Sequence, residues 1–294
     1  MDTVLAGKRI GWIGLGNMGV PMVRHLRLAG AEIAVWNRSI GPVEAAVASG
    51  MHGAATPREL GEWVGEGIVC LCLTTPDVVA EVVVGKGGLT AGLGDKGLVI
   101  DFGTTGVATT KRLAEKARWI DAPMSGGQIG AEAANLTIMA GGSAADFARA
   151  KPILDIVGGR VTHLGPVGSG QVAKLANQLI VAQTIDAVAQ ALRMGELAGL
   201  DSGLLRRALM GGFAESRILD VLGDRMARRD FSPGGKASWQ LKDLRLAREL
   251  ADSVGFESET MRNSLAQWET LVDQMGLGEL DHSGFYELYA GPER

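Results

Sequence analysis

The chain has 294 residues, of which 46% are hydrophobic and 21% charged, and its formal net charge is −4. These values allow sizeable cores and favour two domains over one, and the absence of a basic tract argues against a nucleic-acid or anionic-membrane partner. With no apolar run of about 18 residues and no signal-like beginning, the sequence predicts no membrane span, and we expect a cytoplasmic protein.

Short apolar runs alternate with helical stretches in the first half of the chain. Strands are predicted over residues 9–13, 32–36, 67–73 and 97–103, helices over 19–29 and 77–84, and two more strands at WIDAPM and LTIMAGG. Uninterrupted β-branched and leucine runs are typical of parallel strands that are covered on both faces. The alternation therefore predicts an α/β fold with a doubly wound sheet.

The pattern changes near Gly165, and every later stretch is predicted to be helical. Residues 171–200 form one expected helix of about 40 Å, and further helices are expected over 202–210, 216–227, 238–254 and 257–275. The turn GPVGSGQ sets the boundary, with domains of residues 1–166 and 167–294, the second all-helical and led by a long interdomain helix. One small domain cannot cover so long a helix, so we expect a homodimer or homotetramer.

The cysteines and histidines give no sign of a metal site. Cys70 and Cys72 stand two positions apart in an apolar run, which predicts that both side chains pack on one face of a strand. Such near neighbours make a poor disulfide, and the histidines form no cluster with metal-ligand spacing.

A glycine-rich turn joins the first predicted strand to the first predicted helix. It reads G-x-G-x-x-G and consists of Gly14, Leu15, Gly16, Asn17, Met18 and Gly19. In such loops the first glycine permits a tight turn, the second lets the backbone approach a pyrophosphate, and the third lets helix and strand pack closely. Free N–H groups at the start of the helix then meet the phosphate. This context predicts a dinucleotide site in a Rossmann-type domain, with a glycine turn that binds nothing as the alternative.

The end of the second predicted strand carries Asn37, Arg38 and Ser39. Domains that bind NAD usually place an acidic residue here for the ribose 2′-hydroxyl. A carboxylate would repel a 2′-phosphate, whereas a guanidinium can hold it with two charge-assisted hydrogen bonds. We therefore expect NADP rather than NAD, and the alternative is that Arg38 is a solvated surface charge.

Two further loops are predicted at the carboxyl ends of strands, where ligands bind in doubly wound folds. One contains Leu73, Thr74 and Thr75, and the other contains Thr104 between Gly103 and Thr105. Their hydroxyls and backbone amides are candidates for the nicotinamide half of the cofactor. An ordinary polar turn is equally compatible with either loop.

Five segments resemble the β-hydroxyacid dehydrogenase family, of the 3-hydroxyisobutyrate dehydrogenase, tartronate semialdehyde reductase and glyoxylate/succinic semialdehyde reductase type. In chain order they are IGWIGLGNMGVPMVRHLRLAG, DAPMSGGQIGAEAANLTIMAGG, GPVGSGQVAKLANQLIVA, LKDLRLA and GLGELDHSGF. The resemblance covers nearly the whole chain. It implies an oxidoreductase that interconverts a short β- or γ-hydroxyacid and its semialdehyde or oxoacid, and it leaves the substrate and the direction open.

The resemblance also implies roles for single residues. Lys174 matches the family's catalytic lysine, Thr104 matches a cofactor-binding threonine, and Lys242 matches a lysine that closes over the cofactor. The positions that match the family's substrate contacts are Ser125, Gly126, Gly127, Asn177 and Gln178.

The residues themselves support this assignment of Lys174. It stands in an apolar helical stretch, with Asn177 and Gln178 one turn further along the same face. A lysine there must either extend to water or face a polar cleft. In a cleft, its ammonium can stabilise an alkoxide and donate a proton, and its amine can take the proton back in the reverse direction. The Ser125 hydroxyl and the backbone N–H groups after it can form a nest for a substrate carboxylate.

Two other classes of protein stay open. A noncatalytic NADP-binding interaction module would not need Lys174. A reductase of imines or neutral carbonyls would not need the loop that begins at Ser125, and imine reductases with the same two-domain plan typically lack a lysine at the position of Lys174. We therefore expect a metal-free, NADP-dependent enzyme that acts on a small carboxylate-bearing substrate.

Overall fold

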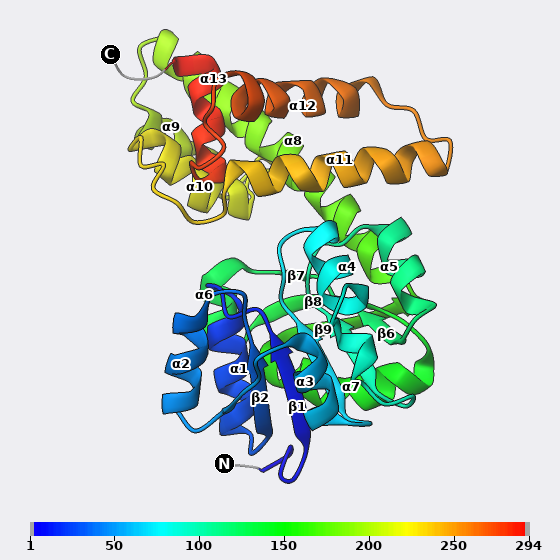
Figure 1. Ribbon diagram of the computed structural model, residues 1–294. Helices are drawn as coiled ribbons and strands as arrows, with labels where there is room; N and C mark the ends of the chain where they lie inside the picture. Colours follow the sequence, from blue (N-terminus) through cyan, green and yellow to red (C-terminus); the bar gives the residue numbers. More distant parts are fainter. Residues whose placement is uncertain (1–2, 292–294) are drawn as a thin grey trace. The chain divides into compact units, whose positions relative to one another are not determined.

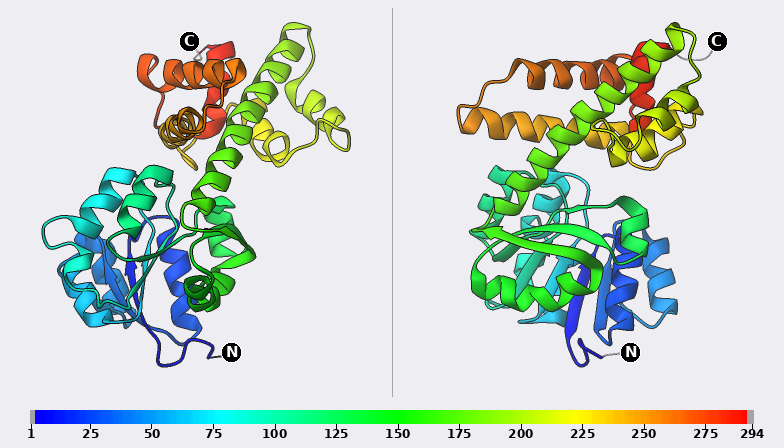
Figure 2. Two further views of the ribbon diagram at one scale, coloured as in Figure 1. Left: turned by 90° about the vertical axis from the view of Figure 1, so that its right-hand side faces the viewer. Right: turned by 180° about the vertical axis from the view of Figure 1, so that it is seen from behind.

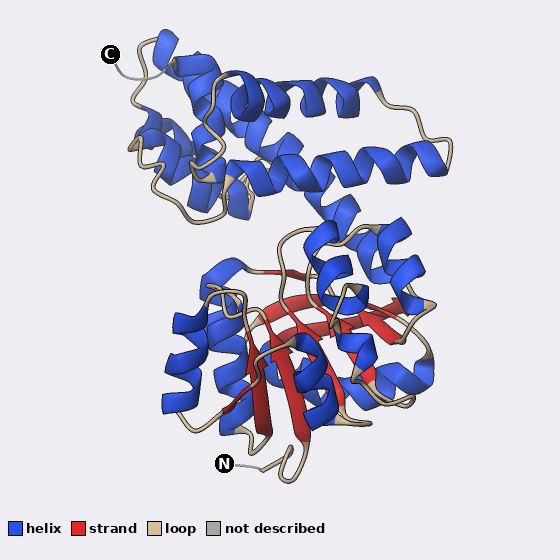
Figure 3. Cartoon of the chain, in the orientation of Figure 1, coloured by secondary structure: helices blue, strands red, loops and turns tan. Residues whose placement is uncertain are grey.

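The computed structural model describes residues 3–291 of the chain (Figure 1). The contacts within it divide the chain into two compact units, Met1–Lys174 and Leu175–Arg294. Every named strand in the described residues ends at or before Gly165, so the first unit is α/β and the second is helical (Figure 3). One continuous helix, α8 (Ser169–Leu197), runs across the division (Figure 2). The predicted fold class, a doubly wound sheet followed by a helical domain with a long connecting helix, is confirmed.

The first unit contains one sheet with the strand order β3-β2-β1-β4-β5-β6-β8-β7, and β9 pairs with β8. Strands β1 to β6 are parallel, whereas β8 runs antiparallel to β6. The order reverses at β1, which lies between β2 and β4 and therefore marks the switch point where such folds bind ligands. The strands are β1 (Arg9–Ile13), β2 (Glu32–Trp36), β3 (His52–Gly53), β4 (Ile68–Leu71), β5 (Leu98–Asp101), β6 (Arg118–Asp121), β7 (Met124–Ser125), β8 (Leu136–Gly141) and β9 (Gly158–Gly165).

Successive residues of each parallel strand point to opposite faces and so enter two separate cores. Trp12 and Ile100 lie in one core, which is covered by α1, α2, α6 and α7. Their neighbours Ile13 and Val99 lie in the other core, which is covered by α3, α4 and α5. The helices of this unit are α1 (Gly19–Leu28), α2 (Ile40–Ala48), α3 (Pro57–Val64), α4 (Pro76–Val84), α5 (Val107–Ala114), α6 (Gly127–Glu132) and α7 (Ala144–Val157), with a short 3-10 turn η1 (Leu89–Ala91).

The predicted strands are confirmed, but three of them are shorter than expected and three further strands were not expected. The run WIDAPM is divided between β6, which ends at Asp121, and β7, which begins at Met124. The runs over residues 67–73 and 97–103 hold strands of only four residues, β4 and β5, because their carboxyl ends turn away as loops. The strands that the sequence did not reveal are β3, β7 and β9. The first two are only two residues long, and β9 has a largely exposed pattern that gives no hydrophobic period.

The second unit packs helices around one apolar core that includes Ile185 of α8, Leu219, Leu244, Trp268 and Phe285. Helices α11 and α12 lie side by side along much of their length (Figures 1 and 2). After α8 the helices are α9 (Ser202–Leu209), α10 (Arg217–Ala227), α11 (Ala237–Ser253), α12 (Glu259–Glu269), the π-helical turn η2 (Thr270–Gln274), η3 (His282–Tyr286) and α13 (Glu287–Ala290). The predicted helices of this half are confirmed to within a few residues at their ends.

Within residues 3–291, no helix combines the length and the apolar character that a membrane span requires. Both cysteines are free thiols. Cys70 lies in the first core and Cys72 packs against it, so the expected packing role on one face is confirmed.

Candidate active site

The glycine loop follows β1 at the switch point, and two of its glycines are required by the packing. Gly14 has a φ of 102°, and a Cβ on it would lie 2.2 Å from the carbonyl oxygen of Cys72. A Cβ on Gly19 would lie 2.0 Å from the carbonyl oxygen of Gly14, so neither position tolerates a side chain. A Cβ on Gly16, in contrast, would meet no heavy atom within 4 Å. The loop is therefore tight against the sheet and open at its middle glycine, which fits the approach of a pyrophosphate.

Asn37 connects the end of β2 to this loop. Its Oδ1 accepts a hydrogen bond from the Leu15 N–H at 3.0 Å, and its Nδ2 donates to the Ser39 carbonyl oxygen at 3.0 Å. Arg38 and Ser39 are exposed beside it. Within residues 3–291, Arg38 has no carboxylate partner. The guanidinium is thus available to an anionic group at the place where the ribose of a dinucleotide would lie.

In the loop after β4, two of the three predicted side chains make structural contacts within the protein. The Thr75 Oγ1 accepts a hydrogen bond from the Val78 N–H at 3.4 Å and caps the start of α4, which has a proline at its first position. Leu73 packs partly into the second core, and Thr74 is exposed. Among the side chains predicted here, that of Thr74 is the one exposed to solvent.

The loop after β5 is held by a buried carboxylate that the sequence did not single out. Asp101 accepts a hydrogen bond from the Gly103 N–H at 2.9 Å and one from the Thr105 hydroxyl at 2.5 Å. Thr105 is only 1% exposed, whereas Thr104 is not buried. The pattern of the loop alone does not distinguish the two threonines, and the resemblance selects Thr104. In the structure the Thr105 hydroxyl stabilises the loop, whereas Thr104 is half-buried.

A second buried carboxylate, Asp121, lies at the end of β6 and holds the start of α8. It accepts hydrogen bonds from the Gly168 N–H at 2.8 Å and from the Gln171 N–H at 2.9 Å. Burial raises the pKa of Asp121, and these backbone N–H groups offset part of the rise. The available sequence signal was an aspartate at a strand end together with a glycine-rich turn before a helix.

Lys174 extends from α8 to the segment that contains the predicted anion loop. Its Nζ donates a hydrogen bond to the Met124 carbonyl oxygen at 2.9 Å, and its side chain is buried, with 8% of the residue exposed. Ser125 is the next residue of β7, and the loop then turns through Gly126 and Gly127, with φ values of 134° and 62°. Both glycines are exposed and occupy the left-handed region that favours glycine.

In the second unit, the predicted amides and Lys242 belong to one polar network. The Asn177 Nδ2 donates to the Gln178 Oε1 at 2.9 Å, and the Gln178 Nε2 donates to Asp243 at 2.7 Å and to Gln240 at 3.1 Å. The Lys242 Nζ lies 2.8 Å from the other oxygen of Asp243. Asp243 and Gln240 are both buried, and they connect the residues that were predicted.

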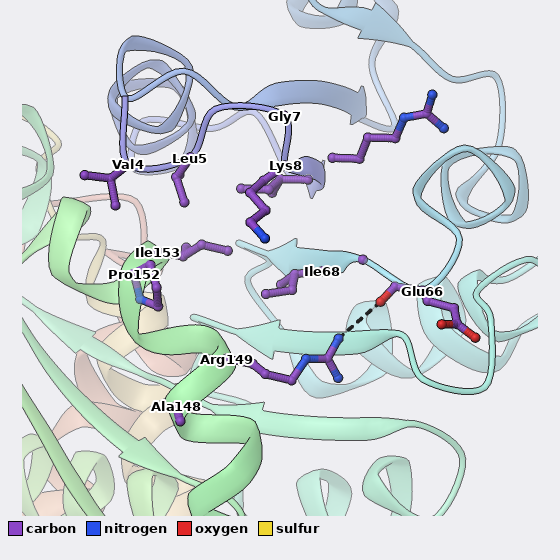
Figure 4. A pocket seen from close by; sticks show the side chains of 13 residues that line it. Val4, Leu5, Gly7, Lys8, Glu66, Ile68, Ala148, Arg149, Pro152 and Ile153 are labelled. Atoms are coloured by element: carbon purple, nitrogen blue, oxygen red, sulfur yellow. Dashed lines mark hydrogen bonds between the residues drawn. The ribbon is translucent and has the colours of Figure 1, made fainter. Parts of the chain in front are cut away.

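A cavity of about 600 Å³ lies elsewhere in the first unit (Figure 4). It is lined by Lys8 and Ile68, at the start of β1 and β4, and by Arg149 and Ile153 of α7. The Arg149 guanidinium is held there by the carbonyl oxygens of Glu66 and Lys96. The cavity is thus at the amino ends of the strands, opposite the edge where the glycine loop lies. No group of three or more possible metal ligands occurs in the part of the chain that the structure describes.

These features define a dinucleotide-binding α/β domain joined by one helix to a helical domain, the architecture of a group of NAD(P)-linked oxidoreductases. The family model for the NAD binding domain of 6-phosphogluconate dehydrogenase matches residues 9–165. The model for the NAD-binding domain of NADP-dependent 3-hydroxyisobutyrate dehydrogenase matches residues 168–289.

Curated and solved relatives agree with these models. The chain is 38% identical to 2-hydroxy-3-oxopropionate reductase of Escherichia coli, over 95% of this chain and 96% of the relative. It is 31% identical to NAD-dependent L-serine dehydrogenase of Pseudomonas aeruginosa, over 96% and 98% of the two chains. The solved 3-hydroxyisobutyrate dehydrogenase of Mycobacterium tuberculosis superposes with a TM-score of 0.84 at 27% identity, over 95% of this chain and 98% of that chain. The chain therefore belongs to the 3-hydroxyisobutyrate dehydrogenase and 2-hydroxy-3-oxopropionate reductase family, which confirms the resemblance.

Proposed function

We propose that this protein is an NADP(H)-dependent oxidoreductase that interconverts a short β- or γ-hydroxyacid and its semialdehyde or oxoacid, with Lys174 as the general acid and base. The observation that carries the proposal is the position of the Lys174 amine. It is buried, and it lies within hydrogen-bonding distance of the residue that precedes the predicted carboxylate loop. The domains proposed with it are residues 1–166 for the cofactor and 167–294 for substrate binding and subunit association.

The bound nicotinamide supplies or accepts the hydride, and the protein has to orient the carbonyl and handle one proton. In the reducing direction, the Lys174 ammonium donates its proton to the oxygen that becomes the alcohol. In the oxidising direction, the neutral amine takes that proton back. A positioned group of this kind contributes about 10² to 10⁴-fold to the rate.

The substrate carboxylate is assigned to the loop of Ser125, Gly126 and Gly127. The exposed glycines allow the backbone N–H groups to turn toward an anion, and the Ser125 hydroxyl adds a donor. Asn177 and Gln178 follow Lys174 by three and four positions on α8, so the three side chains share one face of that helix. We assign their amides to the polar end of the substrate.

The cofactor is assigned to two sets of residues. Backbone groups of the loop from Gly14 to Gly19, with Leu15, Asn17 and Met18 between the glycines, hold the pyrophosphate, and Asn37, Arg38 and Ser39 hold the phosphorylated ribose. Leu73, Thr74, Thr75, Thr104 and Lys242 complete the assignment. The exposed guanidinium of Arg38, which has no carboxylate partner within residues 3–291, supports NADP over NAD.

A substrate screen tests the reaction. The relative that shares 38% identity is a 2-hydroxy-3-oxopropionate reductase, so tartronate semialdehyde is the first compound to assay. Glyoxylate, succinic semialdehyde and methylmalonate semialdehyde complete the set, with NADPH oxidation followed at 340 nm, the usual band of the reduced cofactor. Turnover of at least one acid aldehyde supports the proposal, and turnover of neutral aldehydes or imines alone would overturn it.

Two rival functions are separated by the same assay. A noncatalytic NADP-binding module would bind NADPH without turnover of any compound. A reductase of imines or neutral carbonyls would show no preference for a carboxylate, and the presence of both Lys174 and the loop at Ser125 is the observation against it.

We also propose a homodimer or homotetramer. Helix α8 exposes Ile180, Met194 and Leu197 by 66%, 70% and 74% in the single chain. Met194 and Leu197 are three positions apart and therefore neighbours on the helix surface, and exposed apolar neighbours are typical of a surface that another chain covers. Light scattering coupled to size exclusion should give at least twice the 30.7 kDa of one chain, and a monomer would contradict the proposal.

A further inference from the structure

Gln171 is the most completely buried polar side chain of the first turn of α8. It is 0% exposed, and it precedes Lys174 by three positions, close to one helical turn. Its side chain is directed not along its own helix but into the loop after β5. This residue belongs to neither the predicted cofactor contacts nor the predicted substrate contacts.

Three hydrogen bonds join the Gln171 amide to that loop. The Oε1 accepts from the Thr105 N–H at 3.1 Å and from the Gly106 N–H at 3.2 Å. The Nε2 donates to the Gly103 carbonyl oxygen at 2.9 Å. Both ends of the amide are therefore used, and the loop is held on both sides of Thr104.

The backbone of Gln171 is fixed as firmly as its side chain. Its N–H donates to the Asp121 carboxylate, which also accepts the Gly168 N–H. Asp101 is paired with Asp121 in the register of the neighbouring parallel strands β5 and β6, and it holds the start of the same loop by accepting the Gly103 N–H. The loop after β5 and the first turn of α8 are thus joined into one rigid block by buried groups.

This block connects two residues that the proposed function uses. Thr104 is the residue of the loop that is not buried, and it is assigned to the cofactor. Lys174 is one turn beyond Gln171 and is assigned to proton transfer. A change in the block would shift one relative to the other without removing either.

We propose that Gln171 is a positioning residue, whose amide sets the cofactor loop at a fixed distance from the amine of Lys174. The inference rests on the proposed function of these two residues. Glutamine suits the task because one planar amide supplies an acceptor for two N–H groups and a donor for a carbonyl. Methionine has nearly the same length and supplies neither, and glutamate supplies only the acceptor when ionised.

The first experiment compares Gln171→Met with the wild-type enzyme and with Gln274→Met. Gln274 is an exposed glutamine at the end of η2 with no role in the proposed site, which makes it a matched control. Misplacement of reacting groups by about 1 Å can cost on the order of 100-fold in rate. We expect kcat to fall about 10-fold to 100-fold in Gln171→Met, with less than about a threefold change in KM for NADPH. The control should retain the wild-type kcat.

Two further readouts separate positioning from a general loss of structure. Deuterium at the transferred position of NADPH should give a larger isotope effect on kcat in Gln171→Met than in the wild type, because the hydride step becomes slower. Amide hydrogen exchange at Thr105 and Gly106 should become faster, while exchange in β1 and β4 stays unchanged. Faster exchange at these two amides with wild-type kcat and isotope effect would overturn the inference.

If Gln171→Met does not fold, Gln171→Glu serves in its place at pH 8. It keeps the acceptor for Thr105 and Gly106 and loses the donor to Gly103. Slow exchange at the two amides with a lower kcat and a larger isotope effect supports the inference, and wild-type kinetics would overturn it. Failure of the proposed function is a different result: Lys174→Ala would then retain turnover, whatever Gln171 does.

Discussion

The Nζ of Lys174 donates a hydrogen bond to the carbonyl oxygen of Met124 at 2.9 Å, across 50 positions of sequence. This contact fixes the amine beside β7, one residue before Ser125. A long, flexible side chain is thereby held in one place, with most of its surface removed from water. Such a fixed amine is what a proton-transfer group requires, since general catalysis depends first on geometry.

Replacement of Lys174 by alanine should lower turnover by about 10² or more, because the oxygen of the substrate would lose its proton donor. NADPH binding, followed by the fluorescence of the cofactor, should change little. Lys151→Ala is the matched control, because Lys151 is an exposed lysine that pairs with Asp155 on α7. Near-normal turnover in Lys174→Ala would contradict the assignment of Lys174 as the general acid and base.

Replacement of Arg38 by alanine should weaken NADPH binding about 10-fold to 100-fold, the range for loss of a charge-assisted contact. NADH binding should stay nearly unchanged, because NADH has no 2′-phosphate. The measurement is the dissociation constant of each cofactor by fluorescence titration, with Arg160→Ala, an exposed arginine of β9, as the control. Equal losses for the two cofactors would argue against a 2′-phosphate site.

Asn37→Asp tests the same 2′-phosphate site by introducing a negative charge, where the previous variant removes a positive one. The introduced carboxylate can still accept the Leu15 N–H that the Asn37 Oδ1 accepts now, so the glycine loop should keep its shape. It would repel the 2′-phosphate and suit the ribose 2′-hydroxyl of NADH. We expect the ratio of kcat/KM values to move toward NADH, and an unchanged ratio would place the 2′-phosphate elsewhere.

How far the sequence predicts this molecule can be seen at the ends of the strands. The apolar runs predict β1 and β2 well, since buried parallel strands are hydrophobic throughout. They do not show where β4 and β5 stop, because Cys72 and Phe102 are apolar loop residues that continue the run. Strand β9 is not predicted, because most of its side chains are exposed and its sequence therefore has no continuous apolar run.

In the candidate site, too, the sequence predicts the features that depend on local pattern and does not predict those that depend on tertiary contacts. Glycine spacing predicts the loop at Gly14, because its conformation depends on local backbone geometry. The tasks of Asp121 and Gln171 depend on contacts between residues 47 to 68 positions apart, which no local pattern encodes. Thr105 illustrates the limit, because the pattern of its loop does not distinguish it from Thr104, and the burial of its side chain depends on tertiary contacts.

Replacement of Ser125 by alanine should raise KM for an acid aldehyde about 10-fold, the effect of losing one hydrogen bond to a charged group. KM for a neutral aldehyde of similar size should change little, and this neutral compound serves as the internal control. Steady-state kinetics with the two substrates provide the measurement. Parallel increases for both would indicate that Ser125 shapes the pocket without binding the carboxylate.

The free cysteines give a prediction on stability. Burial raises the pKa of Cys70 far above its ordinary value of 9.0, and burial, with a smaller contribution from the Asp101 carboxylate, raises the pKa of Cys72 to about 12. Above pH 9.0 the unfolded chain ionises these thiols, whereas the folded chain keeps their protons. The folded state then binds more protons than the unfolded state, so the free energy of unfolding must fall as the pH rises.

The Cys70 thiol alone should contribute a decrease of about 1.4 kcal/mol per pH unit above its ordinary pKa. Urea unfolding of the wild type and of Cys70→Ala between pH 8 and pH 10 measures this contribution as the difference between the two slopes, since other titrating groups are common to both proteins. The variant starts less stable because of the cavity, but its free energy of unfolding should decline less steeply. Parallel pH dependences would show that the Cys70 thiol ionises as readily in the folded chain as in the unfolded one, and would place water beside β4.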